Sequence, residues 1–137
     1  MPAIRNTIKI NASLEEVWAV LGDPARAPEY SPGVVTARME GTRRFCTDVS
    51  GNQIEEEISD ISQEKRTYRF RHVKIPVPVK NSHGRFAVVA DNQHAIVTMD
   101  WEFEALDPTK EAELVPMLDG ASKQTLEELR KRVESQR

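Results

Sequence analysis

The spacing of apolar residues changes along the chain, and each change predicts a different element. Residues 4–10 (IRNTIKI) alternate in polarity and predict a first strand. The next segment carries an apolar stripe at helical spacing, made of Leu14, Val17, Trp18 and Leu21. Ser13 and Glu16 fit a capping box at the start of this helix, and Gly22 is well placed to end it. Pro24 then predicts the start of a second, short helix.

The middle of the chain alternates with a period of two and predicts six strands. Their expected ranges are 33–40, 43–50, 53–61, 66–75, 79–90 and 93–105. Strands with such short connections pair antiparallel in chain order. Residues 109–137 return to helical spacing, with a stripe formed by Leu114, Leu118, Ala121, Thr125, Leu129 and Val133. Pro116 is expected in the first turn of this helix or at a delayed start.

This order of elements predicts an α+β fold in which one long helix covers one face of a curved antiparallel sheet. A single helix cannot fill the concave face of seven strands, so we expect a cavity, with the two short helices closing one side. We expect residues 1–137 to form a single domain.

Composition and charge narrow the range of partners. The chain is 39% hydrophobic and 30% charged, and its net charge of −3 is spread over interleaved acids and bases. This argues against nucleic acid or an anionic membrane surface as a partner, and no apolar run is long enough to span a bilayer. A single cysteine, Cys46, permits neither an internal disulfide nor a cysteine-based metal site, and a cytoplasmic protein is expected. The sequence leaves open whether the chain forms a homodimer.

Motifs for metals and cofactors are missing from the sequence. Of the three histidines, His83 and His94 fall on the outer sheet face or at a turn, so they cannot converge with His72 on a metal ion. No glycine-rich phosphate or dinucleotide motif occurs, and we expect no cofactor.

Three stretches resemble a known family in order and spacing: INASLEEVWAVLGDPARAPEYSPGV, VPVKNSHGRF and VTMDWEFEALDP, followed by the terminal helix. The chain is similar to the small polyketide cyclase/dehydrase-like proteins of the START and birch-pollen-allergen superfamily. The resemblance implies the helix-grip fold, a seven-stranded curved antiparallel sheet around a cavity. That superfamily includes cyclases, hydrolases and lipid carriers, so the fold alone does not choose the function. Tyr30 stands where relatives often carry tryptophan.

Strand register predicts which side chains face the cavity. A three-residue loop at 77–79 would place Phe70 opposite Phe86 and His72 opposite Gly84. A three-residue turn at 63–65 would place Glu56 opposite His72.

A two-residue Gly51–Asn52 turn would place Thr47 beside Glu56, and Cys46 would then face away from the cavity. On the outer face, Glu57 is expected opposite Arg71.

The candidate site combines three catalytic residues with an apolar wall. His72, oriented by Glu56, would transfer protons, and Tyr30 at the lip of the cavity or Tyr68 would hydrogen-bond a developing enolate. The remaining ligand-binding candidates are Tyr68, Phe70, Ser82, Gly84, Phe86, Met99, Trp101, Thr47, Met117 and Ala121. Simpler interpretations stay open: Glu56 turned outward by a bulge, His72 as a structural histidine, and Tyr30 as a packing aromatic.

These residues predict a cyclase- or dehydratase-type enzyme acting on a largely apolar, carbonyl-bearing small molecule. The alternative is a non-catalytic carrier for a hydrophobic metabolite or lipid, which needs the same cavity without proton chemistry. A buried carboxylate is costly. An inward Glu56 beside His72 would therefore favour the enzyme.

Overall fold

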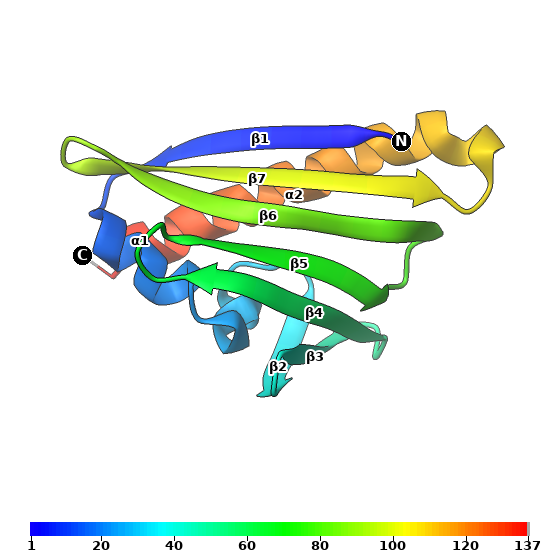
Figure 1. Ribbon diagram of the computed structural model, residues 1–137, viewed down its shortest axis with the longest axis horizontal. Coiled ribbons are helices and arrows are strands. Elements are labelled where there is room, and N and C mark those ends of the chain that lie inside the picture. The colour runs from blue at the N-terminus through cyan, green and yellow to red at the C-terminus, as the bar shows by residue number, and fades with distance from the viewer. Residues whose placement is uncertain (137) are drawn as a thin grey trace.

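Seven strands pair into one antiparallel sheet in the order β1-β7-β6-β5-β4-β3-β2 in the computed structural model, which describes residues 1–136 (Figure 1). The strands are β1 (Ala3–Ile10), β2 (Val34–Glu40), β3 (Arg43–Asp48), β4 (Gln53–Ser62), β5 (Thr67–Lys74), β6 (Val79–Asp91) and β7 (His94–Ala105). The helices are α1 (Leu14–Leu21), the 3-10 helices η1 (Pro24–Glu29) and η2 (Pro108–Lys110), and α2 (Glu111–Glu134). The order and type of these elements confirm the expected fold class.

The start and end of α1 have identifiable causes. Ser13 accepts a hydrogen bond from the Glu16 amide while the Glu16 carboxylate accepts one from the Ser13 amide, which confirms the capping box. Gly22 is the C-cap with a φ of −76°, so a left-handed conformation is not the reason for glycine there. A Cβ at this position would lie 2.3 Å from the ring of Trp18, and only glycine leaves room for that ring.

The long helix α2 covers one face of the sheet. It runs behind the strands in Figure 1 and packs mainly against β1 and β7. Its buried positions are Leu114, Leu118, Ser122, Thr125, Leu126, Leu129 and Val133. The expected stripe is therefore correct except at Ala121, which is only half-buried. Pro116 lies inside the helix rather than at its start, and Arg137 lies outside the described residues.

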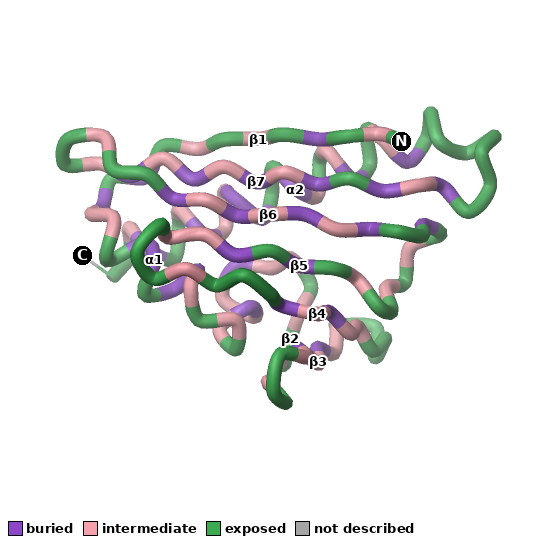
Figure 2. Tube along the Cα trace, in the orientation of Figure 1, coloured by how far each residue is buried: buried purple, intermediate pink, exposed green. Residues whose placement is uncertain are grey.

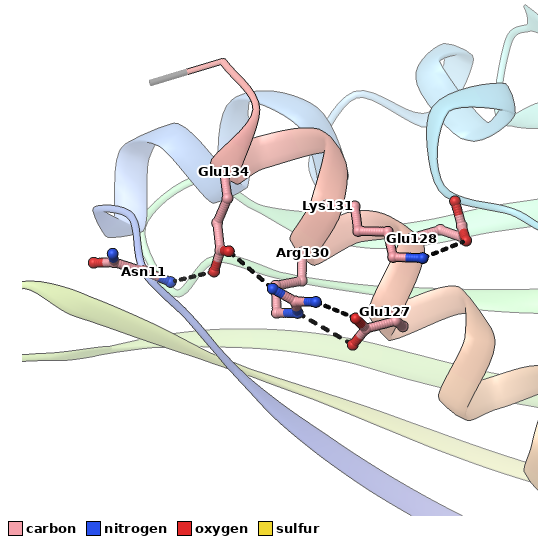
Figure 3. A network of polar contacts seen from close by, with 6 residues as sticks. All are labelled: Asn11, Glu127, Glu128, Arg130, Lys131 and Glu134. Carbon is pink, nitrogen blue, oxygen red and sulfur yellow. Dashed lines mark hydrogen bonds and ion pairs between the residues drawn. The ribbon is translucent and has the colours of Figure 1, made fainter.

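Polar contacts link the last turns of α2 to Asn11, the residue that follows β1 (Figure 3). Arg130 bonds the Glu127 carboxylate and also donates to Glu134 over 2.9 Å. The other Glu134 oxygen accepts from the Asn11 amide, also over 2.9 Å. Glu127 pairs with Arg130 and Glu128 pairs with Lys131, in each case three residues apart. The pairs at a spacing of four, Glu127 with Lys131 and Glu128 with Arg132, do not form; Arg132 lies 3.6 Å from Glu29 instead.

Buried positions alternate mainly with partly buried ones along β6 and β7, as Figure 2 shows. No helix within residues 1–136 combines the length and apolar character needed to cross a membrane.

The register between β5 and β6 differs from the expected one by two residues. Phe70 pairs with Gly84 and Tyr68 with Phe86, so the prediction that Phe70 faces Phe86 and His72 faces Gly84 is wrong. The connection after β5 spans residues 75–78 and is longer than the three residues expected. A shift of two leaves every side chain on its expected face. Gly84 pairs well with Phe70 because a Cβ there would lie 2.4 Å from the Phe70 ring.

The register between β3 and β4 differs by an odd number and exchanges the two faces of β3. The turn spans Val49 to Asn52 and is held by the Asp48 carboxylate, which accepts from the Ser50 and Asn52 amides. Arg44 therefore pairs with Glu56, and Thr47 pairs with Gln53. The predictions that Thr47 lies beside Glu56 and that Cys46 faces away are both wrong. A one-residue change in a turn is sufficient to cause this.

The register between β4 and β5 is as expected. Glu56 pairs with His72, and Glu57 pairs with Arg71 on the outer face. A bulge does occur next to Glu56, but the extra residue is Val73 on β5, so Glu56 stays on the inner face.

Candidate functional site

A cavity of about 280 Å³ lies between the inner face of the sheet and α2. Its apolar wall includes Phe70, Phe86, Met99, Trp101, Leu118 and Ala121. Its polar groups are Tyr30, Ser31, Arg44, Asp48, Glu56, His72 and Thr125. Eight of the residues chosen from the sequence therefore line it: Tyr30, Glu56, His72, Phe70, Phe86, Met99, Trp101 and Ala121.

The other five chosen residues do not line the cavity. Tyr68 is fully buried behind Tyr30, and Ser82 lies behind His72. The Phe70 ring occupies the space above Gly84, so this glycine does not reach the cavity. Thr47 is on the other face of β3.

Met117 is 52% exposed on α2, because the apolar stripe that faces the sheet passes through Leu114 and Leu118 instead.

A larger hollow of about 520 Å³ lies on the outer face of the sheet, but its lining is mostly charged. Two of its pairs satisfy each other: Arg5 donates to Asp100 over 2.5 Å, and His83 lies 3.1 Å from Glu102. A small-molecule site is usually apolar with a few convergent polar groups, and the inner cavity fits that description better.

Arg44 and Glu56 form a buried ion pair on adjacent strands. Arg44 is 5% exposed and Glu56 8% exposed, so the carboxylate does point inward. Arg44 also donates to the Pro24 carbonyl oxygen over 3.2 Å. Burial disfavours the guanidinium charge and is the largest single influence, but Glu56, Tyr68 and Tyr30 together outweigh it and the pKa of Arg44 is raised. The sequence analysis missed Arg44; the signal available was that a buried carboxylate needs a cationic partner on a neighbouring strand.

His72 is hydrogen-bonded to Ser82 rather than to Glu56. Its Nδ1 lies 2.7 Å from the Ser82 Oγ, which also accepts from the Trp101 indole over 2.8 Å. Ser82, not Glu56, thus orients the imidazole. Burial lowers the pKa of His72, Glu56 opposes this shift, and Arg44 adds to it. The ring is therefore neutral at neutral pH.

Tyr30 is inside the molecule rather than at the lip, with an exposed fraction of 3%. Its hydroxyl lies 3.3 Å from that of Tyr68. Burial is the main cause that raises the pKa of both phenols, so both stay protonated and can donate hydrogen bonds. Of the two, Tyr30 lines the cavity.

Neither a metal site nor a reactive thiol is evident in the described residues. Within positions 1–136, no three His, Cys, Asp or Glu side chains gather closely enough to hold a metal ion. Cys46 is buried on the same face of β3 as Arg44, and burial raises the pKa of its thiol to about 11. A thiol that stays protonated is a poor nucleophile.

A long helix held against a curved antiparallel sheet, with a cavity between them, defines the helix-grip class of proteins. The chain belongs to the polyketide cyclase / dehydrase and lipid transport family, whose sequence model matches residues 1–134.

Solved structures share the fold at low sequence identity. An uncharacterized protein from Bacillus thuringiensis is 19% identical with a TM-score of 0.89, covering 96% of this chain and 98% of that one. The di-domain ARO/CYC BexL from the BE-7585A biosynthetic pathway is 22% identical with a TM-score of 0.84, covering 98% of this chain and 47% of BexL. Norcoclaurine synthase from Thalictrum flavum, in complex with dopamine and hydroxybenzaldehyde, is 18% identical with a TM-score of 0.75, covering 99% and 88%. A comparison with curated protein sequences gives no match.

Proposed function

We propose that the chain is a cytoplasmic cyclase- or dehydratase-type enzyme that acts by acid–base chemistry on a small, largely apolar, carbonyl-bearing compound. The observation that carries the proposal is that Glu56, His72 and Tyr30 line one cavity whose remaining wall is largely apolar. A cavity that only holds an apolar compound gains nothing from a buried carboxylate, whose burial is costly. Family membership supports the same general chemistry.

The proposed mechanism divides the work among these side chains. The Glu56 carboxylate removes a proton from the carbon next to the carbonyl, and the electron pair moves onto the carbonyl oxygen. His72 and Tyr30 donate hydrogen bonds to that enolate oxygen. We give the proton transfer to Glu56 rather than to His72, because burial disfavours the imidazolium that His72 would become on taking up a proton, and its Nδ1 is already engaged with Ser82.

The enolate then follows one of two courses. Its carbon attacks a second carbonyl group in ring closure, and the new alkoxide takes the proton from Glu56. Alternatively, it expels a β-hydroxyl group, which leaves as water with that same proton. Both courses return Glu56 to its carboxylate form. The cavity walls contribute by folding the substrate and excluding water.

Two cavity variants test the mechanism on diketones that undergo aldol cyclisation and on β-hydroxy ketones, with product formation followed by mass spectrometry. Glu56→Gln and His72→Ala are each expected to lower kcat/KM about 10²- to 10⁴-fold. His83→Ala is the matched control, because His83 lies on the outer face beside Glu102. Wild-type turnover of a genuine substrate by either cavity variant contradicts the mechanism.

The second candidate function is non-catalytic carriage of a hydrophobic metabolite, and the Arg44–Glu56 pair is the observation that favours it. Because the two charges satisfy each other, the carboxylate also has a structural interpretation. A carrier is expected to retain a co-purifying apolar ligand in native mass spectrometry, equally in wild type and His72→Ala, and to convert none of the carbonyl compounds.

A further inference from the structure

The Ser82 hydroxyl lies between two ring nitrogens, and their chemistry decides where its proton goes. The Trp101 indole nitrogen is 2.8 Å away and can only donate, so Ser82 accepts there. The His72 Nδ1 is 2.7 Å away on the other contact. Ser82 is 2% exposed, so its own hydroxyl proton needs a partner inside the protein.

One proton arrangement satisfies all three groups. Within the described part of the chain, Ser82 Oγ has hydrogen bonds only with Trp101 and His72. If His72 donated from Nδ1, the Ser82 proton would have no acceptor. If Ser82 donates to Nδ1 instead, every group is paired, and the single imidazole proton sits on Nε2. Burial, which keeps His72 neutral, agrees with this assignment.

The Nε2–H of His72 is then available to a molecule in the cavity. His72 lines the cavity, and no acceptor among residues 1–136 bonds Nε2. Arg44 Nε is fully buried and has no hydrogen-bond partner, whereas His72 Nε2 is not among the buried atoms of that kind. The occupant therefore meets a fixed hydrogen-bond donor with no net charge.

The rest of the cavity favours a neutral occupant. Arg44 directs one amino group at Glu56 and another at the Pro24 carbonyl oxygen. Both charges of the pair are thereby used within the protein, and an anionic ligand would lose hydration without gaining a free cation.

Cavity volume limits the size of that occupant. An apolar cavity of about 150 Å³ holds one benzene ring. The 280 Å³ of this partly open cavity therefore has room for a compound of one or two rings.

We propose that the cavity takes a neutral compound of one or two rings, whose oxygen accepts a hydrogen bond from the Nε2–H of His72, and that Ser82 is the positioning residue that keeps the proton on Nε2. This deepens the proposed function and rests on it for the role of the bound oxygen, which is the carbonyl oxygen that becomes an enolate. His72 acts as a fixed donor, and Ser82 and Trp101 act through it.

The test measures the His72 tautomer by ¹⁵N NMR of the imidazole nitrogens and then titrates three matched probes. These are 1-tetralone, a two-ring ketone; tetralin, the same skeleton without oxygen; and 1-naphthoate, a two-ring anion. The free protein is expected to show the Nε2–H tautomer. 1-Tetralone is expected to bind about tenfold more tightly than either other probe and to shift the Nε2–H signal.

Variants of Ser82 separate positioning from folding. Ser82→Ala is expected to give a mixture of tautomers and to abolish the preference for 1-tetralone over tetralin, while Ser82→Thr keeps the hydroxyl and restores both. Ser59→Ala, an exposed serine on β4, is the control and is expected to match wild type. Should Ser82→Ala not fold, the wild-type tautomer and probe order still decide the question.

An Nδ1–H tautomer in the wild type overturns the inference, as does equal or tighter binding of tetralin or 1-naphthoate. Failure of the proposed function has a different signature: 1-tetralone binds as expected, but no carbonyl compound is converted.

Discussion

Arg44 and Glu56 place two opposite charges where the chain is otherwise apolar, and their energetic value depends on both being present. Removing one partner leaves the other charge buried and uncompensated, which typically costs about 3–5 kcal/mol. Replacing both with apolar residues of similar volume is often neutral. The pair is therefore a weak source of net stability but a strong constraint on which side chain stands opposite Glu56.

We expect Arg44→Met to lower the free energy of unfolding by about 3–5 kcal/mol, because Glu56 would be left alone in the core. The double variant Arg44→Met/Glu56→Leu is expected to recover most of that loss. Urea denaturation of the two single variants and the double variant measures the coupling. Additive losses across the cycle would show that the two side chains do not interact.

Replacing Gly84 or Gly120 with alanine is expected to change the stability of the protein in opposite directions. A Cβ on Gly84 would lie 2.2 Å from the Asp100 carbonyl oxygen and 2.4 Å from the Phe70 ring, so Gly84→Ala is expected to destabilise the protein by about 1–3 kcal/mol. Gly120, on α2, has nothing within 4 Å, so Gly120→Ala is expected to stabilise it by about 1 kcal/mol. Thermal denaturation compares them, and equal effects of the two variants contradict this packing argument.

At the scale of elements, the sequence predicts each strand and helix but not every pairing. The β4–β5 register is predicted by the turn at 63–65 together with alternation, because the polar outer face and the apolar inner face agree on the same alignment. The β3–β4 register is not, because it depends on the length of the turn: five residues, 48–52, separate the paired positions Thr47 and Gln53, instead of the two expected. Asp48 selects the longer turn through hydrogen bonds to backbone amides, a contact that alternation does not reveal. Arg44 was missed for this reason.

The contact between the end of α2 and Asn11, the residue that follows β1, also acts at the scale of elements. The Asn11 amide donates to Glu134, which Arg130 holds in place. We expect Glu134→Ala to raise hydrogen exchange at the Asn11 amide and in the last turn of α2, while the centre of the helix stays protected. Glu128→Ala, which loses only an exposed ion pair, is the control. Unchanged exchange at Asn11 in Glu134→Ala would show that this contact does not hold the helix end.

At the scale of the whole molecule, the lowered pKa of His72 predicts how the stability of the protein depends on pH. Its folded pKa lies below its ordinary value of 6.5, so as the pH falls through that value the unfolded chain takes up a proton that the folded chain does not. The free energy of unfolding therefore falls between pH 6.5 and the lower folded pKa, and this contribution is complete above 6.5. Carboxylates with lowered pKa values, such as Asp48 and Glu57, act at more acidic pH.

His72→Gln is expected to remove that slope, since no proton is then taken up at this position. His83→Gln is the control and is expected to keep it, because His83 is on the outer face. Urea denaturation at a series of pH values between 5 and 8 makes the comparison. The same slope in wild type and His72→Gln would assign the effect to other groups.

The overall architecture was the most predictable part, because every level of the sequence agreed on it. Period, caps and turn residues all gave the same order of elements, and one long helix had one face to cover. The hydrogen bond between Ser82 and His72 was not predictable, because it depends on a two-residue shift between β5 and β6 that leaves the polarity pattern unchanged.

The position of β1 at one edge of the sheet also has a consequence for synthesis. β1 is made before β7, yet within residues 1–136 it pairs with β7 alone; the Arg5–Asp100 bond joins residues 95 positions apart. A ribosome adding roughly 5–20 residues per second keeps the first strand waiting for several seconds before its partner emerges. During that interval β1 is an unpaired strand with apolar residues on one side, which is a hazard for aggregation. Pairing of β1 with the rest of the sheet is thus a late event, and a chain truncated before β7 lacks the strand with which β1 pairs.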